Sequence, residues 1–149
     1  MSEPENIGIA MLCSGFSCIC PIGCWPQAQN VVTTITSSQS FYTGMIKPRH
    51  GVKIIIQITS VSGTSPTLTF SISTGTSDPA IPIISSSSPI SSTGTWVVYI
   101  SEDGTITLNA NGTLSTIGKV SMPVDQIIVN FTVGGTSPSF GISAWVEYD

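Results

Sequence analysis

Apolar and polar side chains alternate with a period of two through most of the chain after residue 50. A strand places successive side chains on opposite faces of a sheet, so this alternation predicts strands with one apolar face. The pattern runs through residues 52–58, 67–73, 96–100, 106–108, 127–133 and 140–146. No segment shows the sustained 3.6-residue period of an amphipathic helix. The sequence therefore predicts an all-β protein.

Turn residues separate the predicted strands. The segments 102–104 (Glu-Asp-Gly) and 111–112 (Asn-Gly) have the composition of hairpin turns. Residues 74–95 contain several prolines and a run of serines, so we expect a long loop there with at most an edge strand near residues 83–84. Trp96 shares the apolar face of its strand and is expected in the core. Short strands joined in this way are typical of an antiparallel β-sandwich or jelly roll.

One turn-like segment occurs twice. Residues 61–68 read Val-Ser-Gly-Thr-Ser-Pro-Thr-Leu, and residues 133–140 read Val-Gly-Gly-Thr-Ser-Pro-Ser-Phe. Glycine permits a positive φ and proline fixes φ at the start of a following strand, so both copies are predicted to be hairpin connections between core strands. The apolar alternation that precedes the two copies differs in parity, so the recurrence alone does not establish a duplication.

The composition favours a protein whose surface is largely covered by partners, or one that is secreted into harsh conditions. The chain has 149 residues, which suits one domain, and only 8% of them are charged, against about 25% in an ordinary soluble domain. Few charges keep free copies of such a protein apart in solution. The net charge of −4 disfavours nucleic-acid binding, which needs clustered Lys and Arg. No apolar stretch reaches the length of a membrane span, and the acidic start is unlike a signal peptide.

Residues 1–30 differ from the rest of the chain. They contain all four cysteines and several large apolar residues without strand or helix spacing. We therefore expect two parts, an extended apolar arm over residues 1–30 and a β-sandwich over residues 31–149. An apolar arm is best explained by docking on a neighbouring subunit or another protein. The residues expected to make that contact are Met11, Leu12, Phe16, Ile19, Ile22 and Trp25.

The cysteines leave three interpretations open. Cys13, Cys18, Cys20 and Cys24 have the spacing C-x4-C-x-C-x3-C. Four thiolates can hold zinc or an iron–sulfur cluster, but the paired C-x2-C knuckles of common zinc sites are absent. Disulfides are possible in an oxidising environment, and the short separation of Cys18 and Cys20 disfavours that pair. Small buried hydrophobic residues are the interpretation we favour, and no metal or cofactor is predicted.

Catalytic residues are not evident. His50 is the sole histidine and no motif surrounds it, so a Ser-His-Asp site has little to be built on. The acidic residues Asp78, Glu102, Asp103 and Asp125 lie next to turn signals and are interpreted as turn formers. The two Gly-Thr-Ser-Pro segments lack the lysine and the following helix of a phosphate-binding loop. We expect a protein that is not an enzyme.

Two further features are candidate contacts with a partner. Lys47, Arg49 and Lys53 lie around His50 and hold most of the basic charge, which suits either a solvated turn or an acidic patch on a partner. Trp145 has the parity opposite to the apolar face of its strand and is expected to point outward. An outward tryptophan favours a subunit interface, and a sugar platform is the alternative.

The two repeated segments also carry a resemblance. Residues 61–72 and 131–144 resemble segments of small virion proteins of tailed bacteriophages, in which a tryptophan-containing strand lies between two such turns, as Trp96 does here. The resemblance covers about residues 45–149 and does not extend to the cysteine-containing arm. It implies a β-sandwich on the outer surface of a phage head, where a decoration or cement protein binds the major capsid protein, commonly as a trimer. A receptor- or glycan-binding module of a fibre or spike is the alternative.

Overall fold

The computed structural model describes residues 8–14, 17–18, 33–43, 46, 48–74, 81–84, 87–120 and 126–148. These residues form strands, turns and bridges, with no helix among them and hence none long enough to cross a membrane. The strands are β1 (Gly8–Met11), β2 (Cys13–Ser14), β3 (Ser17–Cys18), β4 (Thr33–Ile35), β5 (Gln39–Tyr42), β6 (Val52–Thr74), β7 (Ile81–Ile84), β8 (Gly94–Ile100), β9 (Thr105–Ala110), β10 (Thr113–Lys119) and β11 (Ile127–Tyr148). All their pairings are antiparallel.

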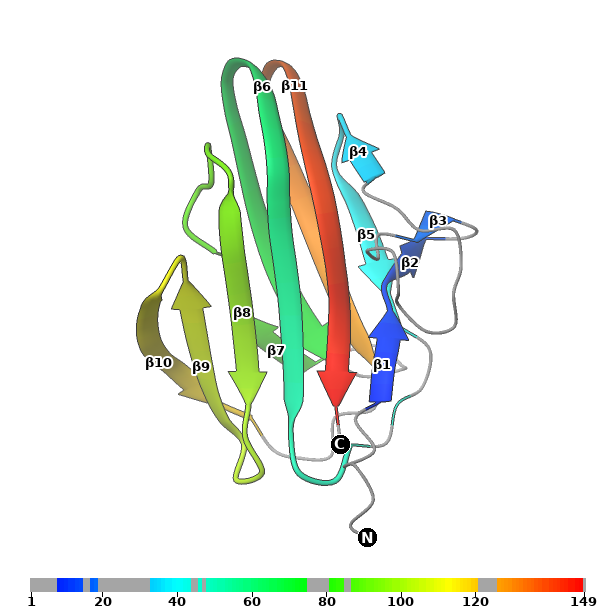
Figure 1. Ribbon diagram of the computed structural model, residues 1–149, viewed down its shortest axis with the longest axis vertical. Coiled ribbons are helices and arrows are strands. Elements are labelled where there is room, and N and C mark those ends of the chain that lie inside the picture. Colours follow the sequence, from blue (N-terminus) through cyan, green and yellow to red (C-terminus); the bar gives the residue numbers. More distant parts are fainter. Residues whose placement is uncertain are drawn as a thin grey trace, which may run out of the picture.

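Two very long strands organise the molecule. β6 has 23 residues and β11 has 22, and they pair with each other along almost their whole length. Both bend in the middle, at the top of Figure 1, so that each strand has one half in the front layer and one half in the back layer. The first half of β6 pairs with β8 and the second half with β7. The 11-stranded sheet therefore folds over itself into a two-layered β-sandwich, as the sequence predicted.

The alternating positions fill the space between the layers. The apolar faces predicted for residues 52–58, 68–72, 96–100 and 140–146 are buried in one continuous core. Phe41 and Phe131 meet edge to face in this core, with ring centroids 5.9 Å apart. Burial of one such large side chain contributes roughly 1.5–3 kcal/mol relative to its exposure, so the period of two is the main source of stability. Trp96 is buried, which confirms its predicted place in the core.

The repeated Gly-Thr-Ser-Pro segments are not hairpin turns, and this prediction was wrong. Each lies inside a long strand, at the bend where that strand passes from one layer to the other. The two bends pair with each other, because Thr64 lies opposite Thr136 and the register is interrupted on both sides of this pair. Glycine and proline produce a sharp bend here, after which each strand runs back down in the other layer (Figure 1). The segments differ from hairpin turns because the two halves of β6 lie in different layers and each half pairs with β11.

A β-bulge explains the parity difference between the two copies. Gly141 lies opposite Ser60, while the next residue, Ile142, lies opposite Ile58, so Thr59 is an extra residue on β6. The Thr59 hydroxyl donates a hydrogen bond of 3.1 Å to the Gly141 carbonyl oxygen. One added residue moves every preceding side chain to the other face. The bulge thereby keeps the apolar face of the first half of β6 directed into the core.

The remaining connections agree with the turn signals. Residues 101–104 join β8 to β9, and the Gly104 amide donates to the Ser101 carbonyl oxygen over 2.8 Å. Asn111 and Gly112, with φ values of 49° and 89°, form the β9–β10 hairpin, because positive φ at both central positions matches the strand twist. The expected edge strand near residues 83–84 is β7.

The described part of the N-terminal arm, residues 8–14 and 17–18, belongs to the sandwich. β1 pairs with the end of β11, and β2 pairs with β5, so the chain passes from an edge of one layer to an edge of the other. Leu12, between β1 and β2, is completely buried in the core. Its side chain fills space within its own chain, which corrects the expectation that it contacts a partner. The expected boundary at residue 30 lies outside the described residues.

Candidate functional site

The charged side chains of the described residues gather at one end of the sandwich. This end contains the start of β6, the end of β8 and the end of β11, which lie together at the bottom of Figure 1 because neighbouring strands are antiparallel. The Asp, Glu, Lys and Arg side chains in the described part of the chain are Arg49, Lys53, Glu102, Asp103, Lys119 and Glu147. The opposite end, where β6 and β11 bend, consists mainly of Ser, Thr, Gly and Pro and has no charged side chain among its described residues. The molecule is therefore polarised along its long axis.

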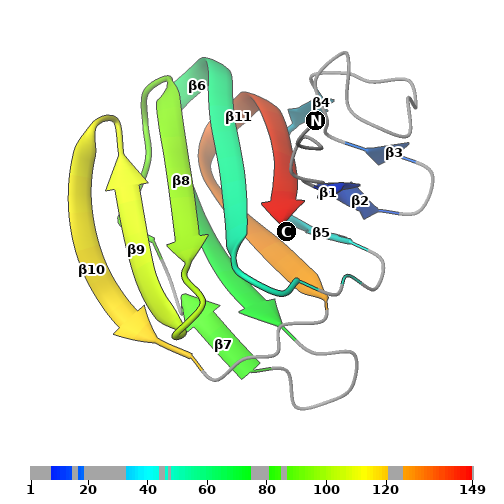
Figure 2. The same cartoon turned by 60° about the horizontal axis from the view of Figure 1, so that its bottom comes forward.

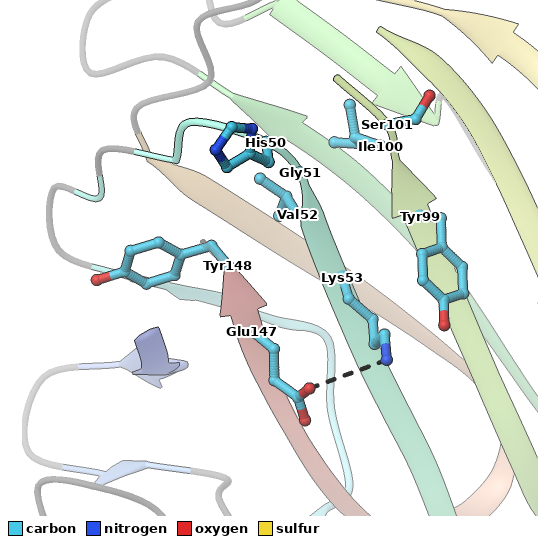
Figure 3. Close-up of a pocket in the computed structure, with 9 residues that line it drawn as sticks. All are labelled: His50, Gly51, Val52, Lys53, Tyr99, Ile100, Ser101, Glu147 and Tyr148. Carbon is cyan, nitrogen blue, oxygen red and sulfur yellow. Dashed lines mark ion pairs between the residues drawn. The ribbon is translucent and has the colours of Figure 1, made fainter. Parts of the chain in front are cut away.

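An open pocket of about 270 Å³ lies at this charged end. Figure 3 shows the residues around it, which come from the start of β6, the end of β8 and the end of β11. They are His50, Gly51, Val52, Lys53, Tyr99, Ile100, Ser101, Glu147 and Tyr148. Val52 and Ile100 are buried, whereas Lys53, Tyr99 and Glu147 are at least partly exposed on the other face of their strands.

Lys53 lies between an acidic and an aromatic neighbour. Its Nζ atom is 3.9 Å from Glu147 Oε1 and 5.0 Å from the centroid of the Tyr99 ring. The ion pair is longer than a hydrogen bond, and both side chains are partly exposed, so it contributes little to stability. Lys53 and Glu147 therefore keep hydrogen-bonding capacity that is directed into the pocket.

Glu147 is held in place by Trp145. The indole Nε1–H of Trp145 donates to Glu147 Oε2 over 2.8 Å, and this leaves Oε1 facing Lys53. Trp145 is partly exposed while its neighbours Ala144 and Val146 are fully buried, so its predicted outward direction is confirmed. The hydrogen bond gives it a positioning role within its own chain. Its proposed contact with another subunit stays a prediction.

The turn beside the pocket has its own hydrogen-bond network. Ser101 Oγ donates to Asp103 Oδ1 over 2.7 Å, and the Thr105 amide donates to the same oxygen over 3.0 Å. These bonds, with the Ser101 hydroxyl contributing most, lower the pKa of Asp103 from 3.8 to about 2. The interpretation of Asp103 as a turn former is confirmed, and the Ser101 hydroxyl is directed at this carboxylate.

His50 extends over the rim of the pocket. Its Nδ1 atom is 3.5 Å from Glu102 Oε2, and both side chains are largely exposed to solvent. Arg49, the neighbour of His50, is also exposed. Within the described residues, the structure brings Lys53 and His50 together at the pocket, whereas Lys47 lies outside them.

The structure describes only two of the arm residues that were predicted to contact a partner. Met11 lies in β1, opposite Trp145 on β11, and Leu12 is buried. Phe16, Ile19, Ile22 and Trp25 lie outside the described residues. The contact predicted for these four residues stays a prediction.

Cys13 is disulfide-bonded, so the favoured interpretation as a small buried hydrophobic residue with a free thiol was wrong for this cysteine. Cys13 lies directly opposite Cys18 across the β2–β3 pair. Cys20 and Cys24 lie outside the described residues. No group of three or more potential metal ligands occurs in the part of the chain that the structure describes.

The sequence pattern alone did not indicate Tyr99, Ser101, Glu147 or Tyr148 as members of a site. Each residue alone is ordinary, and the site depends on the register that places Lys53 opposite both Tyr99 and Glu147. A signal was nevertheless present. Lys53 lies inside a predicted strand and Glu147 directly follows one, and such charges are uncommon in this almost uncharged chain.

Comparison with known proteins supports the fold. No protein-family model and no curated protein matches the sequence. The carbohydrate recognition domain of Emp47p is structurally similar, with a TM-score of 0.52 and 10% identity over 98% of this chain and 89% of that chain. This likeness shows a shared β-sandwich fold alone. The structure of infectious bursal disease virus Gt strain gives a TM-score of 0.40 and 11% identity over 96% of this chain and 32% of that chain, a level that carries no argument.

Proposed function

We propose that this protein is a structural virion protein that binds the outside of a capsid and stabilises the shell. The sequence resemblance of residues 61–72 and 131–144 to small virion proteins of tailed phages supports this assignment. The partners would be the major capsid protein and further copies of this chain, with a trimer favoured. Neither nucleic acid nor a membrane is a proposed partner, and catalysis has no part in the role.

The observation that carries the proposal is the distribution of charge. Away from the charged end, the described surface is built from uncharged side chains, mainly Ser and Thr with Gly, Pro, Asn, Gln and apolar residues. The buried centres of protein interfaces are depleted in charged residues, because each charge loses its hydration when it is covered. A surface with so little charge is suited to contact with neighbouring subunits.

The edge of the front layer adds a specific contact region. All seven residues of β10 are exposed, and Figure 2 shows this strand at the outer edge of its layer. Leu114 is 65% exposed and Ile117 is 41% exposed. An exposed edge strand with apolar side chains readily pairs with another chain unless charges or prolines protect it. β10 carries one charge, Lys119 at its end, so it is a suitable surface for a neighbouring subunit.

Stabilisation of the shell would follow from mass action. A protein that binds the assembled shell and not its separated subunits lowers the free energy of the assembled state by an amount that grows with its concentration. Each subunit across a joint between shell proteins adds to this effect without any chemical step.

The test is the number of copies in purified virus particles from the source of the protein. Quantitative mass spectrometry is expected to give a copy number similar to that of the major shell protein. A few copies per particle would instead support a receptor-binding module of a fibre or spike, and absence from particles would refute both roles. In reconstitution, Leu114→Glu should weaken attachment to stripped particles, whereas Glu102→Gln at the charged end should leave it unchanged.

A further inference from the structure

We infer that the pocket between Lys53, Tyr99 and Glu147 is a binding site for a neutral saccharide. The inference goes beyond attachment to a shell and is independent of it, because the pocket lies at the charged end and β10 lies along a layer edge. It rests on the geometry of the pocket and on the balance of charge around it.

The charges of the pocket exclude ionic ligands. Lys53 faces Glu147, and His50 faces Glu102, so each basic group on this rim already has a carboxylate neighbour. A phosphate or sulfate would meet Glu147 directly beside Lys53 and would be repelled. A metal cation would find Glu147 as the single carboxylate among the residues that line the pocket.

The ion pair is well suited to bind hydroxyl groups. Lys53 offers only donors and Glu147 only acceptors, and their nearest atoms are 3.9 Å apart. A hydroxyl group can accept from Nζ and donate to Oε1 at the same time, and adjacent hydroxyls on a sugar ring can divide the two bonds between them. Because Trp145 holds the other oxygen of Glu147, the acceptor is oriented before a ligand arrives.

Aromatic and apolar groups complete the site. Tyr99 stands beside Lys53 in Figure 3, whereas the ring of Tyr148 is directed away from the Lys53–Glu147 pair. Sugar rings carry C–H groups that pack against an aromatic side chain such as Tyr99, and the Tyr99 hydroxyl adds a further hydrogen-bonding partner. The pocket volume of about 270 Å³ is just below the roughly 300 Å³ at which pockets for larger ligands begin. A single sugar ring is therefore the expected occupant, with millimolar affinity because the site is open.

The experiment is a titration of the ¹⁵N-labelled full chain, followed by NMR. The probes are D-glucose, D-galactose, D-mannose and N-acetyl-D-glucosamine, each as the methyl glycoside, with sodium sulfate as the anionic comparison. At least one glycoside is expected to produce saturable shifts of the Lys53, Tyr99 and Glu147 amides. Sulfate is expected to produce none at these positions. Shifts by sulfate alone, or by no probe, would overturn the inference.

Two variants and one matched control test the residues. Tyr99→Ala and Glu147→Gln should each weaken binding about tenfold or more, since each removes a direct contact. Tyr42→Ala is the control, because Tyr42 is 47% exposed and Tyr99 is 41% exposed, but Tyr42 lies outside the pocket. Glu147→Gln keeps a side chain of the same shape, with an oxygen that can accept the hydrogen bond from Trp145. Weaker binding by this variant would therefore reflect the lost carboxylate charge and not a lost side-chain shape. Equal binding by Tyr42→Ala and both pocket variants would contradict the assignment.

Discussion

Gly63, in the bend of β6, lies against the backbone of the β11 bend, and Gly135, in the bend of β11, lies against the backbone of the β6 bend. A Cβ atom on Gly63 would stand 2.7 Å from the Ser137 carbonyl oxygen, and one on Gly135 would stand 2.6 Å from the Ser65 carbonyl oxygen. Their φ values are +116° and +109°, and Ser65 and Ser137 have φ values of 48° and 49°. The two bends thus have nearly the same conformation and pack against each other reciprocally, which is a local two-fold relationship within one chain.

Substitution of either glycine should destabilise the sandwich. Gly63→Ala and Gly135→Ala combine an unfavourable φ with a steric clash against backbone, and we expect a loss of about 2–4 kcal/mol in the free energy of unfolding for each. Gly112→Ala is the matched control, because Gly112 has a φ of +89° with no atom within 4 Å of its Cβ position. Denaturant unfolding should show the control losing only about 1–2 kcal/mol. Equal losses in all three variants would show that the close approach of the bends is unimportant.

Leu12 should contribute to stability although it lies in the predicted arm. Leu12→Ala removes a fully buried side chain from the core, and losses for such changes are about 2–5 kcal/mol. Leu114→Ala, on the exposed strand β10, provides the comparison and should change the free energy of unfolding by less than about 0.5 kcal/mol. If thermal unfolding gave the same result for both variants, the arm would not be part of the folded core.

Two buried threonines should respond oppositely to the same substitution. Thr43 Oγ1 accepts a hydrogen bond of 3.0 Å from the Ile127 amide, so Thr43→Val leaves a buried donor without this partner and should cost about 1–3 kcal/mol. Thr74 is also buried, and its hydroxyl has no hydrogen-bond partner among the residues that the structure describes. Thr74→Val should therefore leave stability unchanged or raise it. Chemical denaturation of the two variants decides the matter, and a greater loss for Thr74→Val would contradict the described hydrogen bonding.

The β8–β9 hairpin should lose stability in acid. The pKa of Asp103 is lowered from 3.8 to about 2, so the folded state binds a proton less readily than the unfolded state. The stabilisation is therefore complete above pH 4 to 5 and disappears as the pH falls toward about 2. Asp103→Asn should remove this part of the pH dependence, and Glu102→Gln should retain it. An NMR titration that places the pKa of Asp103 near 3.8 would refute the assigned hydrogen bonds.

Local signals were sufficient for most strands and turns. Residues 52–58 and 140–146 were assigned from alternation because one face of each must be apolar to cover the core. Asn111-Gly112 was assigned from its permitted positive φ values. The same local reasoning failed for residues 61–68, since glycine and proline permit both a hairpin, whose two arms pair with each other, and a bend that joins two layers. Which of the two forms depends on the partner strand, and the partner lies 72 residues further along the chain.

The amino-acid sequence by itself determined that this protein is all-β, which faces of its strands are buried and where its hairpins turn. These properties follow from side-chain alternation and from the φ preferences of single residues, both of which act over a few positions. Only the tertiary structure decided that β6 and β11 bend together, that Leu12 joins the core and that Lys53 meets Tyr99 and Glu147. Those contacts depend on register between distant strands, because a shift by one residue exchanges the two faces of a strand and disperses the site.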